Sequence, residues 1–270
     1  MRAALPAVAV RVRACGLCGS DLEKLGTDGV IGHEIEGVLD DGTRVTVMHR
    51  VSCGECERCR AGHESTCEEF RELRIAPGGF VESLRATHVL ALPESIREGD
   101  GIWVEPLACV LRAAERVPRG RVLVAGCGAV GQLWVQVLAL RGDDVCVLEP
   151  RSDRLDAALA LGASALDGKV DAAVVTAPAA LRDALAALAP GGTLLAFAAS
   201  GDVPLDLDLV YRNELTLLGS RSATPAAFAA AIELLPSLRL PPVVRLPLDR
   251  FDEGVEMYRR GDALKVVFEP

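Results

Sequence analysis

The composition describes an acidic globular protein. The chain has 270 residues, of which 50% are hydrophobic, and its 29 basic and 38 acidic side chains give a formal net charge of -9. This hydrophobic fraction suffices for two modest cores. The negative charge disfavours nucleic acid or an anionic membrane as the partner and favours a small-molecule substrate.

The N-terminal segment from Met1 to Pro6 lacks the apolar stretch of a signal peptide. Longer apolar runs are broken by charge or glycine before they reach membrane-spanning length. We therefore expect a cytoplasmic protein. In a reducing cytosol its nine cysteines are better explained by metal ligation than by disulfides.

The first 110 residues carry the pattern of an antiparallel β domain. Valines alternate with arginines through residues 7–14, which predicts a half-exposed strand. Further strands are predicted at 35–39, 44–48 and 80–85. Asp41-Gly42, between the first two of these, is a hairpin-turn signal. A helix is predicted from Glu105 to Arg116.

Four cysteines interrupt this domain in a C-x2-C-x2-C-x7-C spacing, namely Cys53, Cys56, Cys59 and Cys67. Four thiolates can surround one zinc ion at about 2.3 Å only where turns fold the chain back on itself, and Gly54 and Gly62 permit such turns. The alternative is a set of unrelated free thiols, but isolated core cysteines are not closely spaced among polar residues. The spacing therefore predicts a structural zinc site.

From residue 121 the pattern changes to alternating strands and helices. Strands are predicted at 122–125, 145–148, 172–176 and 193–198, with helices at 132–140, 153–161 and 181–189. This alternation favours a parallel sheet with right-handed crossovers. A helix at 225–235 is expected to close this domain, and strands at 243–246 and 265–268 to return to the β domain. The predicted domains are thus 1–110 with 236–270, and 111–235.

A glycine turn follows the first of these parallel strands and opens a helix. It contains Gly126, Gly128 and Gly131, with Ala129 and Val130 between the last two. In this context the pattern is typical of dinucleotide binding, because Gly126 allows the tight turn, Gly128 lets the backbone approach a pyrophosphate and Gly131 allows close helix packing. The alternative is a purely structural turn.

Glu149 ends the second parallel strand, eighteen residues beyond the last glycine of the turn. Its carboxylate can accept hydrogen bonds from both hydroxyls of an adenine ribose and would repel a 2′-phosphate. NAD is therefore favoured over NADP as the cofactor. Arg151 and Arg154, just beyond, leave NADP open, and Arg154 is a candidate cofactor contact.

A second set of potential metal ligands lies outside the four spaced cysteines: Cys18, His33, Glu34 and Glu105. A mixed shell of thiolate, imidazole and carboxylate with one open position is the catalytic type of zinc site. Taken singly, Cys18 could be a small buried hydrophobe, His33 a strand histidine and Glu105 a charge at a helix N-terminus. Together they predict a second zinc ion, and so two per chain.

Six segments together carry a family resemblance: Cys15-Gly16-Leu17-Cys18-Gly19-Ser20-Asp21, Gly32-His33-Glu34, the four spaced cysteines, Glu105-Pro106-Leu107-Ala108, the glycine turn and Lys265-Val266-Val267-Phe268-Glu269-Pro270. In this order they resemble the zinc-dependent medium-chain dehydrogenase/reductase family, nearest its polyol, threonine and sugar-alcohol dehydrogenases. The resemblance implies an α/β fold, with a GroES-like antiparallel β domain made from both termini, a Rossmann domain and an active site in the cleft between them.

The resemblance also implies roles for individual residues. Cys18, His33 and Glu105 would bind the catalytic zinc, with Glu34 coordinating directly or standing behind a zinc-bound water. Ser20 would receive the substrate proton, and Asp21 would orient the ligating histidine. The implied reaction is hydride transfer between NAD and a secondary alcohol, such as a polyol, sugar or amino alcohol, or its ketone.

The chain departs from the family pattern in two ways. Relatives usually have a histidine two residues after the motif aspartate, where it passes the relayed proton to solvent, and this chain has Glu23, a carboxylate that can also carry protons. The β domain is shortened, because the initial hairpin is absent and residues 37–48 form a compressed hairpin. We therefore expect exposed strand edges or a partner that covers them, as in a homodimer or homotetramer.

Two alternatives to a polyol dehydrogenase stay open. One is a non-catalytic dinucleotide-binding sensor or scaffold derived from such an enzyme. The other is a biosynthetic dehydrogenase whose shortened β domain admits a bulky substrate. Among the remaining residues, His49 follows a predicted strand and could approach the cleft, and Arg221 could touch a cofactor phosphate.

Overall fold

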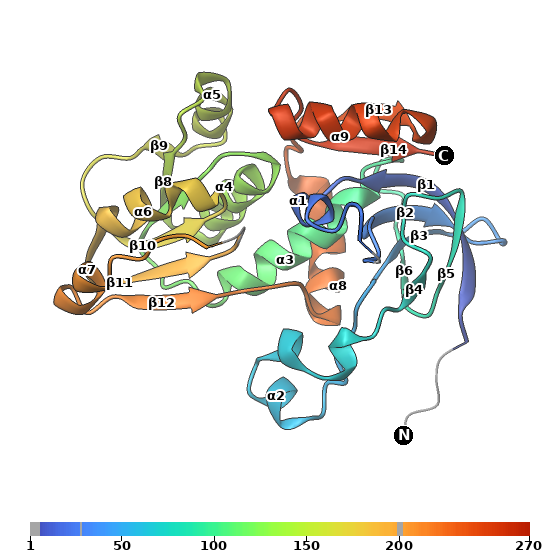
Figure 1. The fold of residues 1–270 in the computed structure, drawn as a ribbon, viewed down its shortest axis with the longest axis horizontal. Coiled ribbons are helices and arrows are strands. Elements are labelled where there is room, and N and C mark those ends of the chain that lie inside the picture. The colour runs from blue at the N-terminus through green and yellow to red at the C-terminus, as the bar shows by residue number, and fades with distance from the viewer. Residues whose placement is uncertain (1–5, 28, 199–201) are drawn as a thin grey trace. The chain divides into compact units, whose positions relative to one another are not determined.

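The computed structural model describes residues 6–27, 29–198 and 202–270, and its contacts divide the chain into two units (Figure 1). Unit 1 comprises Met1–Cys109, Ser222–Ser237 and Pro241–Pro270, and unit 2 comprises Val110–Arg221 and Leu238–Leu240. Met1 to Leu5, within the segment considered above for a signal peptide, lie outside the described residues. Every helix in the described part of the chain is too short or too polar to cross a bilayer.

Unit 1 is built on an eight-stranded sheet in which most neighbours are antiparallel. The strands run in the order β13-β14-β1-β2-β3-β6, while β5 pairs with both β1 and β4. Their bounds are β1 Val8–Gly16, β2 Glu34–Val38, β3 Arg44–Val47, β4 Ile75–Ala76, β5 Ser83–Ala86, β6 Val89–Ala91, β13 Val244–Pro247 and β14 Val266–Glu269. The C-terminal strand β14 pairs antiparallel with β1. This confirms that the end of the chain returns to the N-terminal sheet.

The predicted hairpin between β2 and β3 is confirmed. Gly42 has a φ of +89°, the left-handed conformation that the tight turn requires, and Thr43 N–H donates to Asp41 Oδ1 at 2.9 Å. The alternating valines of β1 place Val10 and Val12 in a buried apolar cluster with Ile35 and Val45 of the neighbouring strands. The period-2 pattern therefore identified the core face of the sheet.

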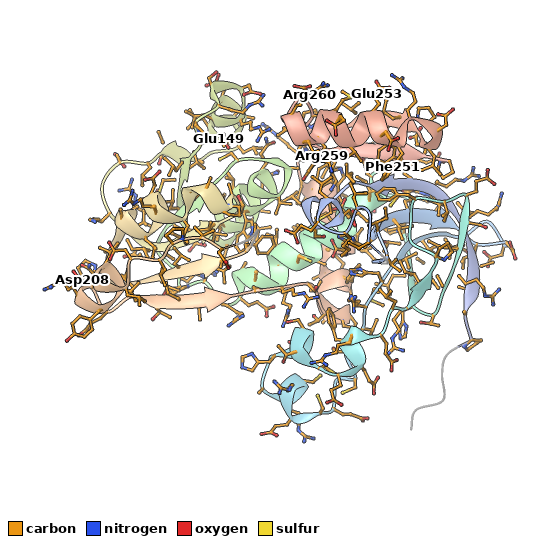
Figure 2. The ribbon with its side chains drawn as sticks, in the orientation of Figure 1. Glu149, Asp208, Phe251, Glu253, Arg259 and Arg260 are labelled. Atoms are coloured by element: carbon orange, nitrogen blue, oxygen red, sulfur yellow. The ribbon has the colours of Figure 1, made fainter. Side chains whose placement is uncertain are left out.

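The helices that accompany this sheet are α1 Gly19–Leu22, α2 Glu57–Arg60, α8 Pro225–Leu234 and α9 Phe251–Arg260, and α3 Val104–Ala114 begins in unit 1 and ends in unit 2. The sequence reading missed α9. Its outer face is charged, with Glu253, Arg259 and Arg260 exposed (Figure 2). On its inner side a Cβ added to Gly254 would lie 2.5 Å from Phe268, so the glycine permits close packing of α9 on β14.

Unit 2 is a parallel sheet with helices between its strands, as the alternating pattern predicts. The strand order is β12-β11-β10-β7-β8-β9, and every pairing is parallel. The strands are β7 Arg121–Ala125, β8 Asp144–Leu148, β9 Ser164–Ala165, β10 Val170–Val175, β11 Leu188–Ala196 and β12 Thr216–Gly219. The helices are α4 Ala129–Arg141, α5 Ser152–Ala160, α6 Leu181–Ala187 and α7 Leu207–Arg212. The two units together confirm the predicted α/β fold class.

The contacts group two segments differently from the predicted domains, α8 and Leu238–Leu240, the second of which belongs to unit 2. The sequence prediction assigned residues 225–235, now α8, to the domain of the parallel sheet, whereas Ser222–Ser237 groups with unit 1. The strand and helix alternation ends at β12, so the sequence pattern does not show which sheet the next helix packs on.

A buried ion pair connects β2, β3 and the segment that leads into α3. Glu36 is fully buried, and its Oε1 accepts hydrogen bonds from Arg44 Nε at 3.0 Å and Nη2 at 2.8 Å. Its Oε2 accepts the N–H of Gly101 at 2.7 Å, and Arg44 Nη1 donates to the carbonyl of Ile96 at 2.7 Å. The carboxylate therefore has its charge and its lone pairs satisfied inside the protein.

Arg44→Met should lower the free energy of unfolding by about 3 kcal/mol, because it leaves the charge of Glu36 buried without a partner. Arg97→Met is the matched control, since Arg97 is 82% exposed in its pair with Asp100 and its loss should cost no more than about 0.5 kcal/mol. Urea unfolding followed by circular dichroism measures both. Equal stabilities of the two variants would contradict this account.

Candidate metal centres and cofactor turn

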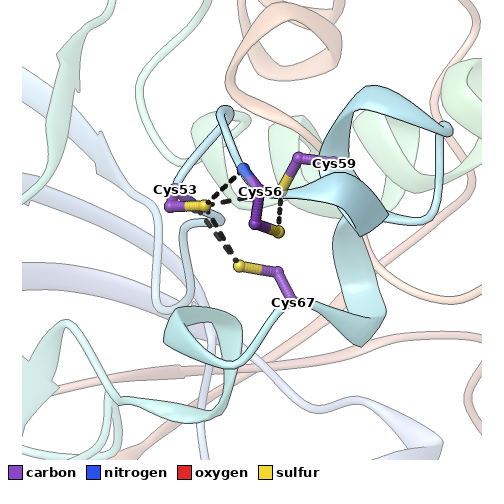
Figure 3. Close-up of side chains that lie close together, drawn as sticks. All are labelled: Cys53, Cys56, Cys59 and Cys67. Carbon is purple, nitrogen blue, oxygen red and sulfur yellow. Dashed lines mark hydrogen bonds between the residues drawn. The ribbon is translucent and has the colours of Figure 1, made fainter.

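The four spaced cysteines form a compact thiol cluster in unit 1 (Figure 3). Their Sγ atoms all lie within 4.8 Å of one another. The Sγ of Cys53 lies 3.8 Å from that of Cys59 and 3.6 Å from that of Cys67, while Cys56 and Cys59 are 3.5 Å apart. Sulfurs at the corners of a tetrahedron around zinc would be about 3.8 Å apart, given a Zn–S bond of about 2.3 Å. The donors fit one structural zinc ion.

The turns that close this cluster follow from its glycines and backbone amides. Gly54 and Gly62 have φ of +76° and +78°, so each reverses the chain between two cysteines.

The thiols of the cluster differ in pKa. Burial raises the pKa of Cys59 to about 12, with a contribution from Cys56. Burial also acts on Cys67, but hydrogen bonds from the N–H groups of Cys53 and Phe70 outweigh it and bring its pKa to about 7. The cluster therefore already favours a thiolate at Cys67.

A second potential metal site, also in unit 1, consists of Cys18, His33 and Glu34. One ligand atom from each lies within 4.8 Å of the others. Cys18 is the residue before α1, and His33 and Glu34 stand at the start of β2. His33 and Glu34 are buried, while Cys18 is partly exposed. A thiolate, an imidazole and a carboxylate brought together in this way fit a zinc ion with an open coordination position.

The fourth predicted ligand, Glu105, lies in the first turn of α3 and outside this group of three. Burial raises the pKa of Glu105, and its carboxylate interacts with the charges of His33 and Glu34. The thiol of Cys109, one turn further along α3, donates to Glu105 Oε1 at 3.4 Å. Glu105 is thus a neighbour of the site rather than one of its three converging donors.

Asp21 connects the segments that carry Cys18 and His33. Its Oδ2 accepts the N–H of Cys18 at 3.1 Å, and its Oδ1 accepts the N–H of Gly32 at 3.0 Å and lies 3.2 Å from His33 Nδ1. A carboxylate only accepts, so Nδ1 carries a hydrogen and Nε2 is the nitrogen available to a metal. The contact agrees with the prediction that Asp21 orients the imidazole of His33.

The pair of Asp21 and His33 shifts the pKa of both groups. Burial alone would raise the pKa of Asp21, but the hydrogen bond with His33 outweighs it and the pKa is lowered. Burial alone would lower the pKa of His33, but the contact with Asp21 raises it well above its usual value. In the absence of a metal ion the pair therefore favours an imidazolium beside a carboxylate.

Lys265 is a member of this site that the sequence reading did not identify. It is buried and forms an ion pair with Glu34 Oε2, and it donates to the carbonyl of Leu17 at 3.1 Å. Its ammonium group also lies 5.5 Å from the centre of the Trp103 ring. Burial would lower the pKa of Lys265, but Glu34 keeps it raised. The only signal of this role in the sequence is that Lys265 is a charged residue directly before the apolar residues of the last strand.

Ser20 and Glu23, the predicted proton-relay residues, lie on and just after α1. The hydroxyl of Ser20 is exposed and donates to Cys18 Sγ at 3.4 Å, so it lies beside a ligand of the candidate site. Glu23 is exposed, and its carboxylate forms no hydrogen bond or ion pair with any residue that the structure describes. The structure thus places Ser20, but not Glu23, next to the potential ligands.

The glycine turn of unit 2 has the shape that a dinucleotide phosphate needs. Gly126 has a φ of +104°, and a Cβ added to Gly131 would lie 2.0 Å from the carbonyl oxygen of Gly126, so neither position accepts a side chain. A Cβ added to Gly128 would meet nothing within 4 Å, which leaves open space directly before α4. Ala129 and Val130 are the first residues of that helix, whose N-terminus favours an anion.

Glu149 stands next to this turn at the end of β8. Its Oε2 accepts the N–H of Cys127 at 2.7 Å and its Oε1 accepts the N–H of Arg151 at 3.1 Å. Each oxygen keeps a lone pair for a further donor. Arg151 pairs with Asp153 at 3.0 Å, and Arg154 is half-buried in α5. The residues fit a dinucleotide whose ribose hydroxyls reach Glu149.

The chain is similar to known dehydrogenases. Residues 6–94 match the family model of the alcohol dehydrogenase GroES-like domain. Sorbitol dehydrogenase of Bacillus subtilis is 30% identical over 264 residues, which cover 78% of this chain and 74% of that protein. L-threonine 3-dehydrogenase of Bacillus licheniformis is 27% identical in an alignment 319 positions long, which covers 97% of this chain and 91% of that protein.

A solved structure extends the likeness to the whole fold. Acetophenone reductase from Geotrichum candidum, in complex with NAD, matches with a TM-score of 0.88 at 19% identity, over 100% of this chain and 91% of that chain. The chain belongs to the family of zinc-binding medium-chain dehydrogenases, with a GroES-like domain of the alcohol dehydrogenase type.

Proposed function

We propose that this protein is a zinc-dependent dehydrogenase that transfers a hydride from a secondary alcohol of a polyol, sugar or amino alcohol to NAD. The observation that carries the proposal is the convergence of Cys18, His33 and Glu34 around one point, with Asp21 fixing the imidazole. An all-cysteine cluster has no open position, whereas this mixed set leaves one for a substrate oxygen. The relatives include a sorbitol and a threonine dehydrogenase.

In this proposal the residues of unit 1 hold the metal and move the proton. Zinc, when bound by Cys18 and His33, supplies a Lewis acid that acidifies the alcohol hydroxyl. Ser20, whose hydroxyl lies 3.4 Å from Cys18 Sγ, takes up the proton. Glu23, exposed after α1, is the group through which that proton reaches solvent. NAD, when bound at the glycine turn, would supply the acceptor for the carbinol hydrogen and its electron pair.

The two carboxylates near the ligands have different roles in this proposal. Lys265 neutralises Glu34 within the buried site, which favours a position for Glu34 behind the open coordination site. Glu105 forms no direct ion pair, and burial raises its pKa although His33 and Lys265 act in the opposite direction, so it is a buried carboxylate that a nearby zinc ion would stabilise. Glu105 therefore stays the proposed third protein ligand beside Cys18 and His33.

Zinc content and turnover test this function together. Plasma emission spectroscopy on the purified protein should give about two zinc ions per chain, and a panel of polyols, sugars and amino alcohols should include one that reduces NAD. Cys18→Ala should lose one zinc ion and all turnover, whereas the fold, supported by the separate thiol cluster, should remain.

Two results would contradict the proposal. Turnover retained in Cys18→Ala would remove the ligand assignment. A wild-type protein that holds two zinc ions, binds NAD and oxidises no alcohol in the panel would favour the sensor or scaffold derived from such an enzyme.

Glu149 should determine the preference for NAD. Glu149→Gln removes the charge that opposes a 2′-phosphate but keeps the shape of the side chain, so the ratio of kcat/KM for NAD to that for NADP should fall about tenfold. Asp153→Asn is the control, since this exposed carboxylate is also close to the turn but pairs with Arg151. If the ratio changes equally in both variants, or in neither, Glu149 does not determine the preference for NAD.

Zinc binding at the mixed site should depend on pH through His33. Zinc takes only a neutral imidazole, and Asp21 raises the pKa of His33 above the usual 6.5. The affinity of the mixed site for zinc should therefore increase with pH, and the increase should continue well above pH 6.5. In Asp21→Asn that rise should end at a lower pH, and affinity at pH 8 should drop by about 10- to 100-fold. Competition with a chromophoric chelator measures both, and coincident pH profiles would contradict the role of Asp21.

A further inference from the structure

Cys109 contacts the proposed zinc ligand Glu105 through its thiol. The two residues are four apart on α3, so their side chains share a face of the helix, and Cys109 Sγ donates to Glu105 Oε1 at 3.4 Å. Glu105 is buried, with 7% of its surface exposed. Its other oxygen, Oε2, accepts no hydrogen bond within the described residue ranges. One oxygen of this buried carboxylate is therefore held by Cys109, and the other can take a further partner.

The surroundings of Cys109 keep its thiol protonated. Burial and the negative charge of Glu105 raise the pKa of this thiol well above its usual value, and Cys18 and Glu34 act in the same direction. An ionised carboxylate only accepts, so the S–H of Cys109 is the donor in the contact with Glu105. The influence of Cys18 and Glu34 also means that Cys109 lies close to the mixed-ligand site of unit 1.

The two buried carboxylates of this region have partners of different charge. Glu34 forms an ion pair with Lys265, whose ammonium group neutralises it. Glu105 is held by a neutral thiol, a weak donor that orients the carboxylate but does not cancel its negative charge. A group that holds a metal ligand in place strengthens metal binding, and the charge of the ligand itself attracts the cation. The thiol of Cys109 leaves that charge available to a metal ion.

We propose that Cys109 is a positioning residue of the mixed metal site, whose thiol holds Oε1 of Glu105 so that Oε2 is the oxygen that ligates zinc. This inference rests on the proposed function, in which Glu105 is the third protein ligand. A side chain that only filled space on α3 could be replaced by any residue of similar size. A positioning residue needs a hydrogen-bond donor at this place, and this difference can be tested.

The test measures the zinc affinity of the mixed site by competition with a chromophoric chelator, and the zinc ion that is missing in Cys18→Ala identifies this site. Cys109→Val keeps the size of the side chain but removes the donor, and it should weaken zinc binding there about tenfold. Cys109→Ser keeps a donor and should retain most of the affinity. Cys146→Val is the matched control, because it changes another buried cysteine, on β8, and should leave the affinity unchanged.

A double variant shows whether Cys109 acts through Glu105. Glu105→Gln should also weaken zinc binding at the mixed site, because it removes the charge of the proposed ligand. If Cys109 works only by holding this carboxylate, Cys109→Val should add no further loss in the Glu105→Gln background. Losses that add in the double variant would contradict the proposed role of Cys109.

Three further outcomes would overturn the role of Cys109. Equal zinc affinity in the wild type and Cys109→Val would show that the donor is not needed. Equal losses in Cys109→Val and Cys109→Ser would show that only packing matters. Weaker thiolate absorption from the mixed site of cobalt-substituted Cys109→Ser would show that Cys109 is itself a ligand.

These measurements need no substrate, so they separate the role of Cys109 from the proposed function. A wild type that holds two zinc ions but oxidises no alcohol would count against the proposed function alone, and the affinities would still decide about Cys109. A wild type that binds zinc only at the thiol cluster would overturn both.

Discussion

The candidate catalytic site depends on one carboxylate, that of Asp21. It accepts hydrogen bonds from the N–H groups of Cys18 and Gly32 and contacts His33, so a single buried anion fixes the start of α1 and the start of β2 relative to each other. The interaction also decides which imidazole nitrogen is free for a metal. The pairing of β1 with β2 sets Gly16 opposite Glu34 and so brings the two segments together, and Asp21 then holds Cys18 and His33 in place within that frame.

Charge balance is the second constraint on unit 1. Glu34, Glu105, Asp21 and Cys18 bring potential negative charge into a largely buried region, where an unpaired anion is costly. The buried ammonium of Lys265 offsets part of it and reaches the site from the opposite end of the chain. A divalent cation would offset more of it. The return of the C-terminus as β14 therefore contributes to the site as well as to the sheet.

The elements that could be predicted from the sequence are those whose partners are close along the chain. The four cysteines lie within fifteen residues and the glycine turn within six, so spacing alone indicates their chemistry. Cys18 and His33 are distant along the chain, so residue type alone could only make them candidates, and the family resemblance gave each of them a role. Lys265 was out of reach, since its partner Glu34 is set by the pairing of distant strands, whereas His49, which packs against His33, was named only as a residue that could approach the cleft. Helix α9 was missed although Phe251, Val255 and Tyr258 repeat at helical spacing on one face, so its sequence did carry a signal.

The central claim is that Asp21 assembles one open, mixed-ligand metal site that is independent of the thiol cluster. Visible absorption of the cobalt-substituted protein tests it most directly, because cobalt bound by four thiolates and cobalt bound by a mixed set with an open position give distinct spectra. The account predicts two components in the wild type, of which Asp21→Asn weakens or removes the mixed one and leaves the thiolate one intact. A spectrum that is identical in the two proteins, or that contains the thiolate component alone in both, would contradict it.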